Sequence, residues 1–314
     1  MIFPESLKTG DKIAIISPAT IVKREYIEGA AALLAGEGFE PVVMPHAYGP
    51  SDGTFAASRA ARIADFHRAW SDPDVRAVLC ARGGYGSVDL LGEFDPDFLR
   101  LNAKWLIGFS DITALQAMLL NAGVASIHGP MAKHMTLLGA TDPCVQSLLH
   151  ILRQGLPVEY KAPVHPLNVV GEATGRLIGG NMAVFGGLSG SEYDIFRSVD
   201  DDDLILFVED ISEKIYAIER RFHRMRLSGA FRRIKGLLVG QFTEYNADRN
   251  HPSMDIMVAR FLHRYGLDKI PVAYGFPVGH VDDNRPLVQG SVTSLSVSSS
   301  EVSLIQHTGL KPSY

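Results

Sequence analysis

The sequence contains few cysteines. Its 314 residues include only Cys80 and Cys144, without CxxC spacing, which excludes a disulfide framework and a cysteine-rich zinc site. Cys80 ends the apolar run VRAVLCA. We therefore interpret it as a small buried hydrophobic residue and not as a nucleophile.

Long apolar runs and an excess of one charge are also missing. No segment reaches the ~18 to 20 uninterrupted apolar residues of a membrane span, and the N-terminal sequence MIFPESLKTGDKIAIISPA has scattered charges and no signal-peptide block. The 30 basic and 35 acidic residues create no broad cationic field. We expect a soluble, cytoplasmic protein that binds neither nucleic acid nor membranes.

What the first half does contain is an alternation of short apolar runs with helical patterns. Strands alternating with helices of ten or more residues predict an α/β fold with a parallel sheet covered on both faces. The predicted strands are 12–17, 40–44, 77–80 and 105–107, and the predicted helices are 24–37, 58–70 and 112–121. Ligands of such sheets bind beyond the carboxyl ends of the strands, so we expect the site in the loops after Cys80 and Ile107.

The length and the 46% apolar content favour two domains. Residues 156–170 contain three prolines and no helical period, and they predict an extended linker between a domain at 1–155 and a domain at 171–314. The second half has predicted strands at 204–208, 236–239 and 291–298 and a helix at 215–227. It is interpreted as a β-rich α/β domain with a larger antiparallel share.

Ser110 lies between an apolar strand and a helix in the segment WLIGFSDITALQAML. A serine on such a sharp turn is typical of a nucleophile elbow, where the next backbone N–H and the helix N-terminus stabilise an oxyanion. The usual GxSxG pattern is incomplete, because Ile112 replaces the second glycine. The alternative is that Ser110 or Asp111 only caps the helix.

The glycine-rich loop RGGYGS at 82–87 follows another predicted strand. Glycines permit positive φ and close approach of backbone N–H groups to a ligand. The loop lacks the Lys-Ser/Thr of a P-loop and does not follow the first strand, which argues against a nucleotide site. It is interpreted as the source of a second oxyanion donor, from Gly84 or its neighbour, or as a purely structural turn.

A serine nucleophile needs a base, and the base needs an acceptor that fixes its tautomer. His280 lies in a loop bounded by glycine and proline, and Glu209 follows a predicted buried strand. We interpret them as base and orienting acid, with Asp210 and Glu213 as possible substitutes for Glu209.

A metal site is the competing hypothesis. It would use His280, Asp282 and Asp283, with His251 or His128 as a further ligand. No HExxH pair is present, and neighbouring aspartates in an extended segment point to opposite sides. We therefore expect no metal.

Several separated blocks together resemble the LD-carboxypeptidases, a family that includes muropeptide LD-carboxypeptidases and microcin C immunity peptidases. The resemblance covers nearly the whole chain. Its blocks are SPA at 17–19, RGGYGS at 82–87, GFSDIT at 108–113, HGPM at 128–131, GGN at 179–181, LFVEDISE at 206–213, Tyr216 with Arg220, GQF at 240–242 and GFPVGH with Asn284 at 275–284.

The resemblance implies a Rossmann-like N-terminal domain, a β-rich C-terminal domain and a serine peptidase whose active site lies between them. It makes Ser110 the nucleophile, Glu209 the acid and His280 the base, with oxyanion donors at the backbone N–H groups of Gly84 and Asp111. It also implies a homodimer that needs no cofactor and releases terminal D-alanine from muropeptide tetrapeptides in cell-wall recycling.

Substrate details stay open at this point. Arg82 is a candidate for binding the substrate carboxylate, with a structural ion pair as the alternative. The chain departs from the family pattern at Val88 and Asp89 and in RPLVQG after Asn284.

Two other functions are alternatives to this interpretation. A microcin C-type peptidase acting on peptidyl or aminoacyl nucleotides tends to have more aromatic residues than the Phe185 and Tyr193 found in GGNMAVFGGLSGSEY. A non-enzymatic sugar- or nucleotide-binding protein would not need Ser110.

Overall fold

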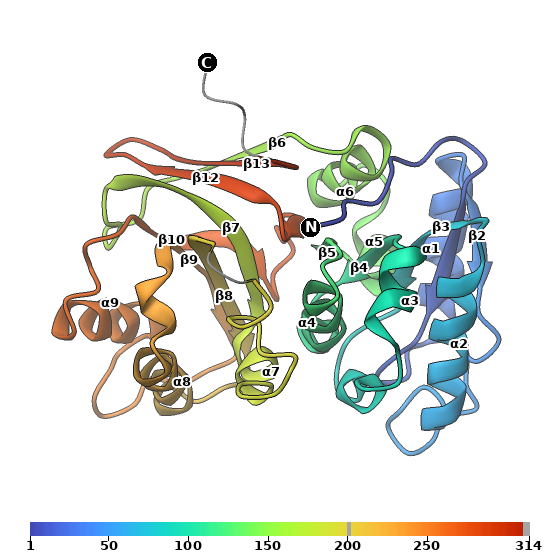
Figure 1. Ribbon diagram of the computed structural model, residues 1–314, viewed down its shortest axis with the longest axis horizontal. Helices are drawn as coiled ribbons and strands as arrows, with labels where there is room; N and C mark the ends of the chain where they lie inside the picture. Colours follow the sequence, from blue (N-terminus) through green and yellow to red (C-terminus); the bar gives the residue numbers. More distant parts are fainter. Residues whose placement is uncertain (200–201, 310–314) are drawn as a thin grey trace. The chain divides into compact units, whose positions relative to one another are not determined.

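The computed structural model describes residues 1–199 and 202–309. The chain folds into two compact units (Figure 1). The first unit comprises Met1–Gly155 together with Asp282–Gln289, and the second comprises Leu156–Val281 and the chain from Gly290 onward. Each unit is built on one sheet with helices, so the predicted α/β fold class is confirmed. No helix in the described ranges combines the length and apolarity that crossing a bilayer requires.

The first unit is built on a Rossmann-like sheet with the strand order β11-β5-β4-β3-β1-β2. All neighbouring strands are parallel except β11, which pairs antiparallel with β5. The strands are β1 (Lys12–Ile16), β2 (Glu40–Val43), β3 (Val75–Cys80), β4 (Trp105–Gly108), β5 (Ser126–His128) and β11 (Leu287–Gln289). The run KIAII of β1 is almost wholly buried, as expected for a parallel strand covered on both faces.

Six helices and two 3₁₀ turns complete the first unit. Ser58 caps the second helix, where its side chain accepts a hydrogen bond from Ala61 N, and the apolar side of that helix buries Phe66 and Trp70. The helices are α1 (Arg24–Gly36), α2 (Arg59–Ser71), α3 (Pro96–Leu101), α4 (Thr113–Asn121), α5 (Ala132–Leu138) and α6 (Pro143–Gln154), and the turns are η1 (Ser87–Leu90) and η2 (Ser110–Ile112).

The second unit is built on a mixed sheet with the order β10-β9-β8-β7-β12-β13-β6. Strands β10, β9, β8 and β7 are parallel, and β7, β12, β13 and β6 are antiparallel, which confirms the larger antiparallel share. The elements are β6 (Val158–Ala162), β7 (Gly171–Asn181), α7 (Met182–Gly187), β8 (Leu204–Ile211), α8 (Ile215–Ser228), η3 (Ala230–Arg232), β9 (Ile234–Thr243), α9 (Met254–Arg264), β10 (Val272–Gly279), β12 (Val292–Val297) and β13 (Val302–His307).

Two segments differ in structure from the sequence-based expectation. Residues 156–170, predicted as a linker, contain β6, which lies between Pro157 and Pro163 and pairs with β13 at the edge of the sheet. An edge strand tolerates prolines at its ends because one side needs no hydrogen bonds. Residues 282–289, in the predicted C-terminal domain, belong to the first unit because β11 pairs with β5.

Candidate active site

Ser110 lies on a tight turn at the carboxyl end of β4. Its φ is 64°, a left-handed conformation that non-glycine residues seldom adopt. A Cβ on Gly108 would lie 2.9 Å from the Ile112 side chain, so the turn needs glycine at 108 and closes over the isoleucine. The Asp111 carboxylate accepts a hydrogen bond from Ser87 N in the neighbouring loop and not from the helix that follows it. The geometry is that of a strand-to-helix elbow.

The glycine-rich loop after β3 packs directly against this turn. A Cβ on Gly83 would lie 2.9 Å from Ser110 Cβ and 3.1 Å from Ser110 Oγ. Gly84 is exposed, with φ of 105°. The Tyr85 N–H donates to Thr20 Oγ1 at 3.0 Å. Tyr85 N–H is therefore engaged elsewhere, which leaves Gly84 as the better candidate donor in this loop.

The side chain of Asp111 joins the two loops. It is 4% exposed, and its Oδ2 accepts a hydrogen bond from Ser87 N at 2.8 Å. Burial raises the pKa of the Asp111 carboxyl, although the Ser87 hydrogen bonds oppose this effect.

Arg82 is the first residue of the glycine-rich loop, and its Nη1 is 3.4 Å from the Ile21 carbonyl oxygen. Among the residues described, no carboxylate lies within ion-pair distance of Arg82.

Glu209 and His280 form a hydrogen-bonded pair in the second unit. Glu209 Oε2 lies 2.7 Å from His280 Nδ1, and the side chains are 0% and 14% exposed. Glu209 belongs to β8 itself, and His280 directly follows β10, so both are placed by regular strands and not by loose loops. A Cβ on Gly279 would lie 3.0 Å from Glu209 Cβ. Glycine at 279 thus permits the close approach.

The two other carboxylates considered for this role have different partners. Asp210 accepts hydrogen bonds from Asn181 Nδ2 at 2.9 Å and from Ala183 N at 2.8 Å. Burial, together with the nearby charge of Glu209, raises the pKa of Asp210 to about 6. Glu213 pairs with Arg221 at 3.2 Å. Among the three acids, it is Glu209 that contacts His280.

The residues of the competing metal hypothesis have separate partners. Asp283 accepts from Cys144 Sγ at 3.4 Å and contacts Arg285, and His251 Nε2 lies 3.7 Å from Glu219. The described part of the chain contains no group of three or more side chains arranged to hold a metal ion.

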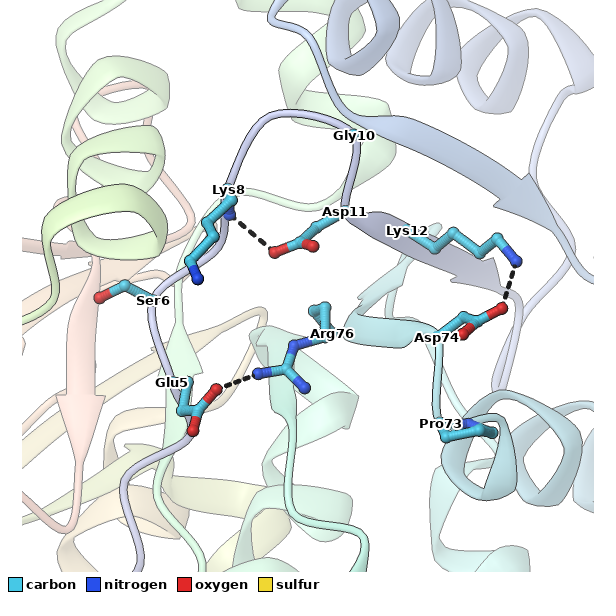
Figure 2. A pocket seen from close by; sticks show the side chains of 9 residues that line it. All are labelled: Glu5, Ser6, Lys8, Gly10, Asp11, Lys12, Pro73, Asp74 and Arg76. Atoms are coloured by element: carbon cyan, nitrogen blue, oxygen red, sulfur yellow. Dashed lines mark hydrogen bonds and ion pairs between the residues drawn. The ribbon is translucent and has the colours of Figure 1, made fainter.

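A pocket of about 340 Å³ lies on the first unit at the amino ends of β1 and β3 (Figure 2). Its charges largely compensate one another, since Lys12 pairs with Asp74 at 2.8 Å and Arg76 pairs with Glu5. Because β1, β3 and β4 are parallel, this pocket lies at the edge of the sheet opposite to Ser110. The lining residues are Glu5, Ser6, Lys8, Gly10, Asp11, Lys12, Pro73, Asp74 and Arg76.

A second pocket of about 340 Å³ lies at the carboxyl ends of β8 and β9. Ser212 and Glu244, at the ends of these strands, both have positive φ, and Ser212 Oγ donates to Glu244 Oε2 at 2.7 Å. The exposed ring of Tyr216 and that of Tyr245 line the pocket. It offers space for part of a ligand at the end of the strand that carries Glu209.

Sequence reasoning missed Arg62, a buried residue of the first unit that contacts the glycine-rich loop. Arg62 lies on α2, three residues before Asp65 and four before Phe66. Both of these side chains are buried, so helical periodicity places Arg62 on the buried face of the helix. A charge on the buried face of a helix was the available signal, because buried charges require specific partners.

Comparison with known proteins adds independent findings. Residues 13–129 match the model of the LD-carboxypeptidase N-terminal domain, and residues 174–295 match that of the LD-carboxypeptidase C-terminal domain. A Synechocystis sp. protein that is named as a carboxypeptidase is 32% identical over 294 residues, which cover 93% of each chain. The murein tetrapeptide carboxypeptidase of Pseudomonas aeruginosa is 28% identical, over 90% of this chain and 92% of its own.

A solved structure agrees with these matches. The crystal structure of muramoyltetrapeptide carboxypeptidase from Oxalobacter formigenes superposes with a TM-score of 0.83 at 28% identity, and it covers 96% of this chain and 100% of that one. The elbow, the glycine-rich loop and the Glu209–His280 pair thus occur within a fold and a sequence pattern shared over nearly the full length. The chain belongs to the LD-carboxypeptidase family of serine-type hydrolases.

Proposed function

We propose that this enzyme hydrolyses the L,D bond that releases terminal D-alanine from muropeptide tetrapeptides, with Ser110 as nucleophile, His280 as base and Glu209 as the acid that orients the base. The observation that carries the proposal is the 2.7 Å hydrogen bond between His280 Nδ1 and the fully buried Glu209. A buried acid at this nitrogen is the arrangement that converts a histidine into a directed general base.

The pair determines which nitrogen of His280 carries out proton transfer. When Nδ1–H donates to Glu209, the lone pair of the neutral ring is on Nε2, and Nε2 is then the atom that accepts the Ser110 proton. The imidazolium formed in that step is stabilised by the Glu209 carboxylate. Because Glu209 is shielded from water, this attraction is stronger than it would be at the surface.

Hydrolysis then proceeds in two steps. Ser110 Oγ attacks the amide carbonyl, the amide C–N bond breaks, and His280 donates its proton to the departing amino group of D-alanine. In the second step His280 takes a proton from the water that attacks the acyl-enzyme, the bond between the acyl carbon and Ser110 Oγ breaks, and His280 returns the proton to Oγ. The backbone N–H groups of Gly84 and Asp111 are the proposed oxyanion donors in both steps.

The substrate class rests on the relatives. Two of them are named murein tetrapeptide carboxypeptidase and muramoyltetrapeptide carboxypeptidase, at 28% identity each. The Escherichia coli microcin C7 self-immunity protein is 24% identical over 96% of this chain, so the microcin-type substrate is kept as the second candidate. The cytoplasmic location, the homodimer, the absence of a cofactor and the carboxylate-binding role of Arg82 stay predictions.

The test is release of D-alanine from L-Ala-γ-D-Glu-meso-diaminopimelate-D-Ala by the purified protein, with a chelator present throughout. We expect release by the wild type and none by Ser110→Ala. The matched control substrate ends in L-alanine and should remain intact. Cleavage of an aminoacyl-nucleotide analogue without cleavage of the tetrapeptide would contradict the muropeptide proposal and favour the microcin-type substrate.

A further inference from the structure

Arg62 is a buried cation inside the first unit. The residue is 2% exposed. Its guanidinium donates from Nη1 to Pro18 O at 2.8 Å and to Gly86 O at 2.7 Å, from Nε to Ala57 O at 3.2 Å, and from Nη2 to Asp89 Oδ2 at 3.0 Å. Removing a charge from water is costly unless hydrogen bonds and an opposite charge compensate it. Here three carbonyl groups and one carboxylate provide that compensation.

One of these carbonyls belongs to a peptide group that is held at both ends. The Gly86 carbonyl oxygen accepts from Arg62, and the N–H of the same peptide group, that of Ser87, donates to Asp111 Oδ2 at 2.8 Å. Two side chains from different elements, α2 and η2, therefore fix the orientation of a single peptide plane. A peptide plane held at both ends cannot rotate about its neighbouring φ and ψ angles without losing a hydrogen bond to a charged group.

The position of this peptide matters because the adjoining backbone contains two glycines, which have no Cβ to restrict φ and ψ. Gly84 and Gly86 have φ of 105° and 125°, and glycine has the widest conformational freedom of any residue. A Cβ on Gly86 would lie 2.8 Å from the Phe55 ring and 3.0 Å from Arg62 Nη1. Glycine is thus required for the close approach of Arg62, and the hydrogen bond from Arg62 supplies a restraint that the glycines themselves do not provide.

We propose that Arg62 is a positioning residue which, together with the Asp111 carboxylate, holds the Gly86–Ser87 peptide and so aligns the backbone N–H groups of Gly84 and Asp111 for the oxyanion. This inference rests on the proposed function. Asp89, one of the positions at which this chain departs from the usual family pattern, supplies the charge that keeps the guanidinium in place.

The experiment compares steady-state D-alanine release by Arg62→Lys, Asp111→Ala, Asp111→Asn and the double variant Arg62→Lys/Asp111→Ala, with thermal unfolding of each. Lysine retains the charge but cannot reach several acceptors in fixed directions. Because oxyanion stabilisation acts in the transition state, we expect roughly a 10- to 100-fold loss of kcat with KM changed less than about threefold. Arg68→Lys, on the exposed side of the same helix, is the matched control and should keep full activity.

Two further readouts separate positioning from general support of the fold. Asparagine at 111 retains an acceptor for Ser87 N and should recover most of the kcat that alanine loses. Because Arg62 and Asp111 hold the same peptide, their effects should overlap, and the double variant should be close to the worse single variant. If Arg62→Lys does not fold, the contrast between alanine and asparagine at 111 decides the question.

Any one of four outcomes would overturn the inference. They are an unchanged kcat in folded Arg62→Lys, a loss that appears only in KM, multiplicative effects in the double variant, and equal activities of the two Asp111 variants. Wild-type enzyme that releases no D-alanine would overturn both the inference and the proposed function, whereas an active wild type with unaffected variants would overturn the inference alone.

Discussion

The carboxyl edges of the two sheets present their reactive groups in different ways. On the first unit Ser110 lies on a turn with positive φ beside a loop with two positive-φ glycines. On the second unit Glu209 is part of β8, and His280 directly follows β10, whose last residue, Gly279, has φ of 129°. A nucleophile must project its oxygen away from the backbone, which a strained turn achieves, whereas an orienting acid must stay buried and still, which a central strand achieves.

The largest loss of activity is expected on removing Ser110 Oγ, the proposed nucleophile. Ser110→Ala leaves both loops in place and deletes only Oγ, so we expect kcat for D-alanine release to fall by at least about 10³-fold. The thermal unfolding midpoint should change little, because alanine adds no atom that the tight turn would have to accommodate. Residual activity above one-hundredth of the wild type would exclude Ser110 as the nucleophile.

The next largest effect is expected at the buried acid. Glu209→Gln preserves shape but cannot stabilise the imidazolium, and it favours the wrong tautomer of His280, so we expect kcat to fall roughly 10²- to 10³-fold. The measurement is kcat against pH for the wild type and the variant. Activity within fivefold of the wild type would show that His280 does not depend on this carboxylate.

A smaller effect is expected where the two loops of the first unit meet. Gly83→Ala places a Cβ 2.9 Å from Ser110 Cβ and 3.2 Å from Asp111 N, which must displace the turn. Because misplacement by about 1 Å can cost 10²-fold in rate, we expect a 10- to 100-fold loss of kcat. Gly36→Ala, at the end of α1 with open space around its Cβ, is the matched control and should have wild-type kinetics.

The smallest effect on activity is expected at Asp210, beside the acid on β8. We expect Asp210→Asn to change kcat less than about threefold, since Asp210 contacts Asn181 and Ala183 and not His280. Its effect should instead be on stability. The folded-state pKa is raised from 3.8 to about 6, so the contribution of Asp210 to folding is greatest below about pH 4 and is lost as the pH rises through about 6.

Urea unfolding at several pH values measures that contribution. Between pH 4 and pH 7 the difference in unfolding free energy between wild type and Asp210→Asn should move by roughly 2 kcal/mol in favour of the variant, because most of the range from 3.8 to about 6 lies within this interval. A pH-independent difference would mean that Asp210 ionises normally in the folded protein.

Much of the first unit could be predicted from the sequence because its strands are continuous apolar runs. Strand β7 could not, because its sequence GEATGRLIGGN is rich in glycine, which normally indicates a loop. The structure gives the reason: a Cβ on Gly179 would lie 1.9 Å from the Phe207 carbonyl oxygen. Strand β10 contains Gly275 and Pro277 and was missed for the same kind of reason.

The candidate site could be predicted to a similar extent. Ser110 and Glu209 stand at strand ends that periodicity locates, whereas His280, which follows the missed strand β10, was assigned from its glycine- and proline-bounded loop and from the family resemblance. The residues alone left Asp210 and Glu213 open as substitutes for Glu209, and the resemblance selected Glu209, the acid that contacts His280. Arg62 could not be assigned a role, because its acceptors include backbone carbonyls up to 44 residues away along the chain. Carbonyl groups have no sequence signature.

The order in which the chain is synthesised limits when the sheet of the first unit can be completed, because β11 lies far from β5 along the chain. A ribosome completes residues 1–155 before it makes the second unit, but Leu287–Gln289, which pair with β5 in the first unit, are synthesised only after Leu156–Val281. Until then β5 is an unpaired edge, and such edges recruit other strands. The first unit is therefore finished after most of the second has been made, and a gene fragment cut at residue 155 would encode a sheet with an unprotected side.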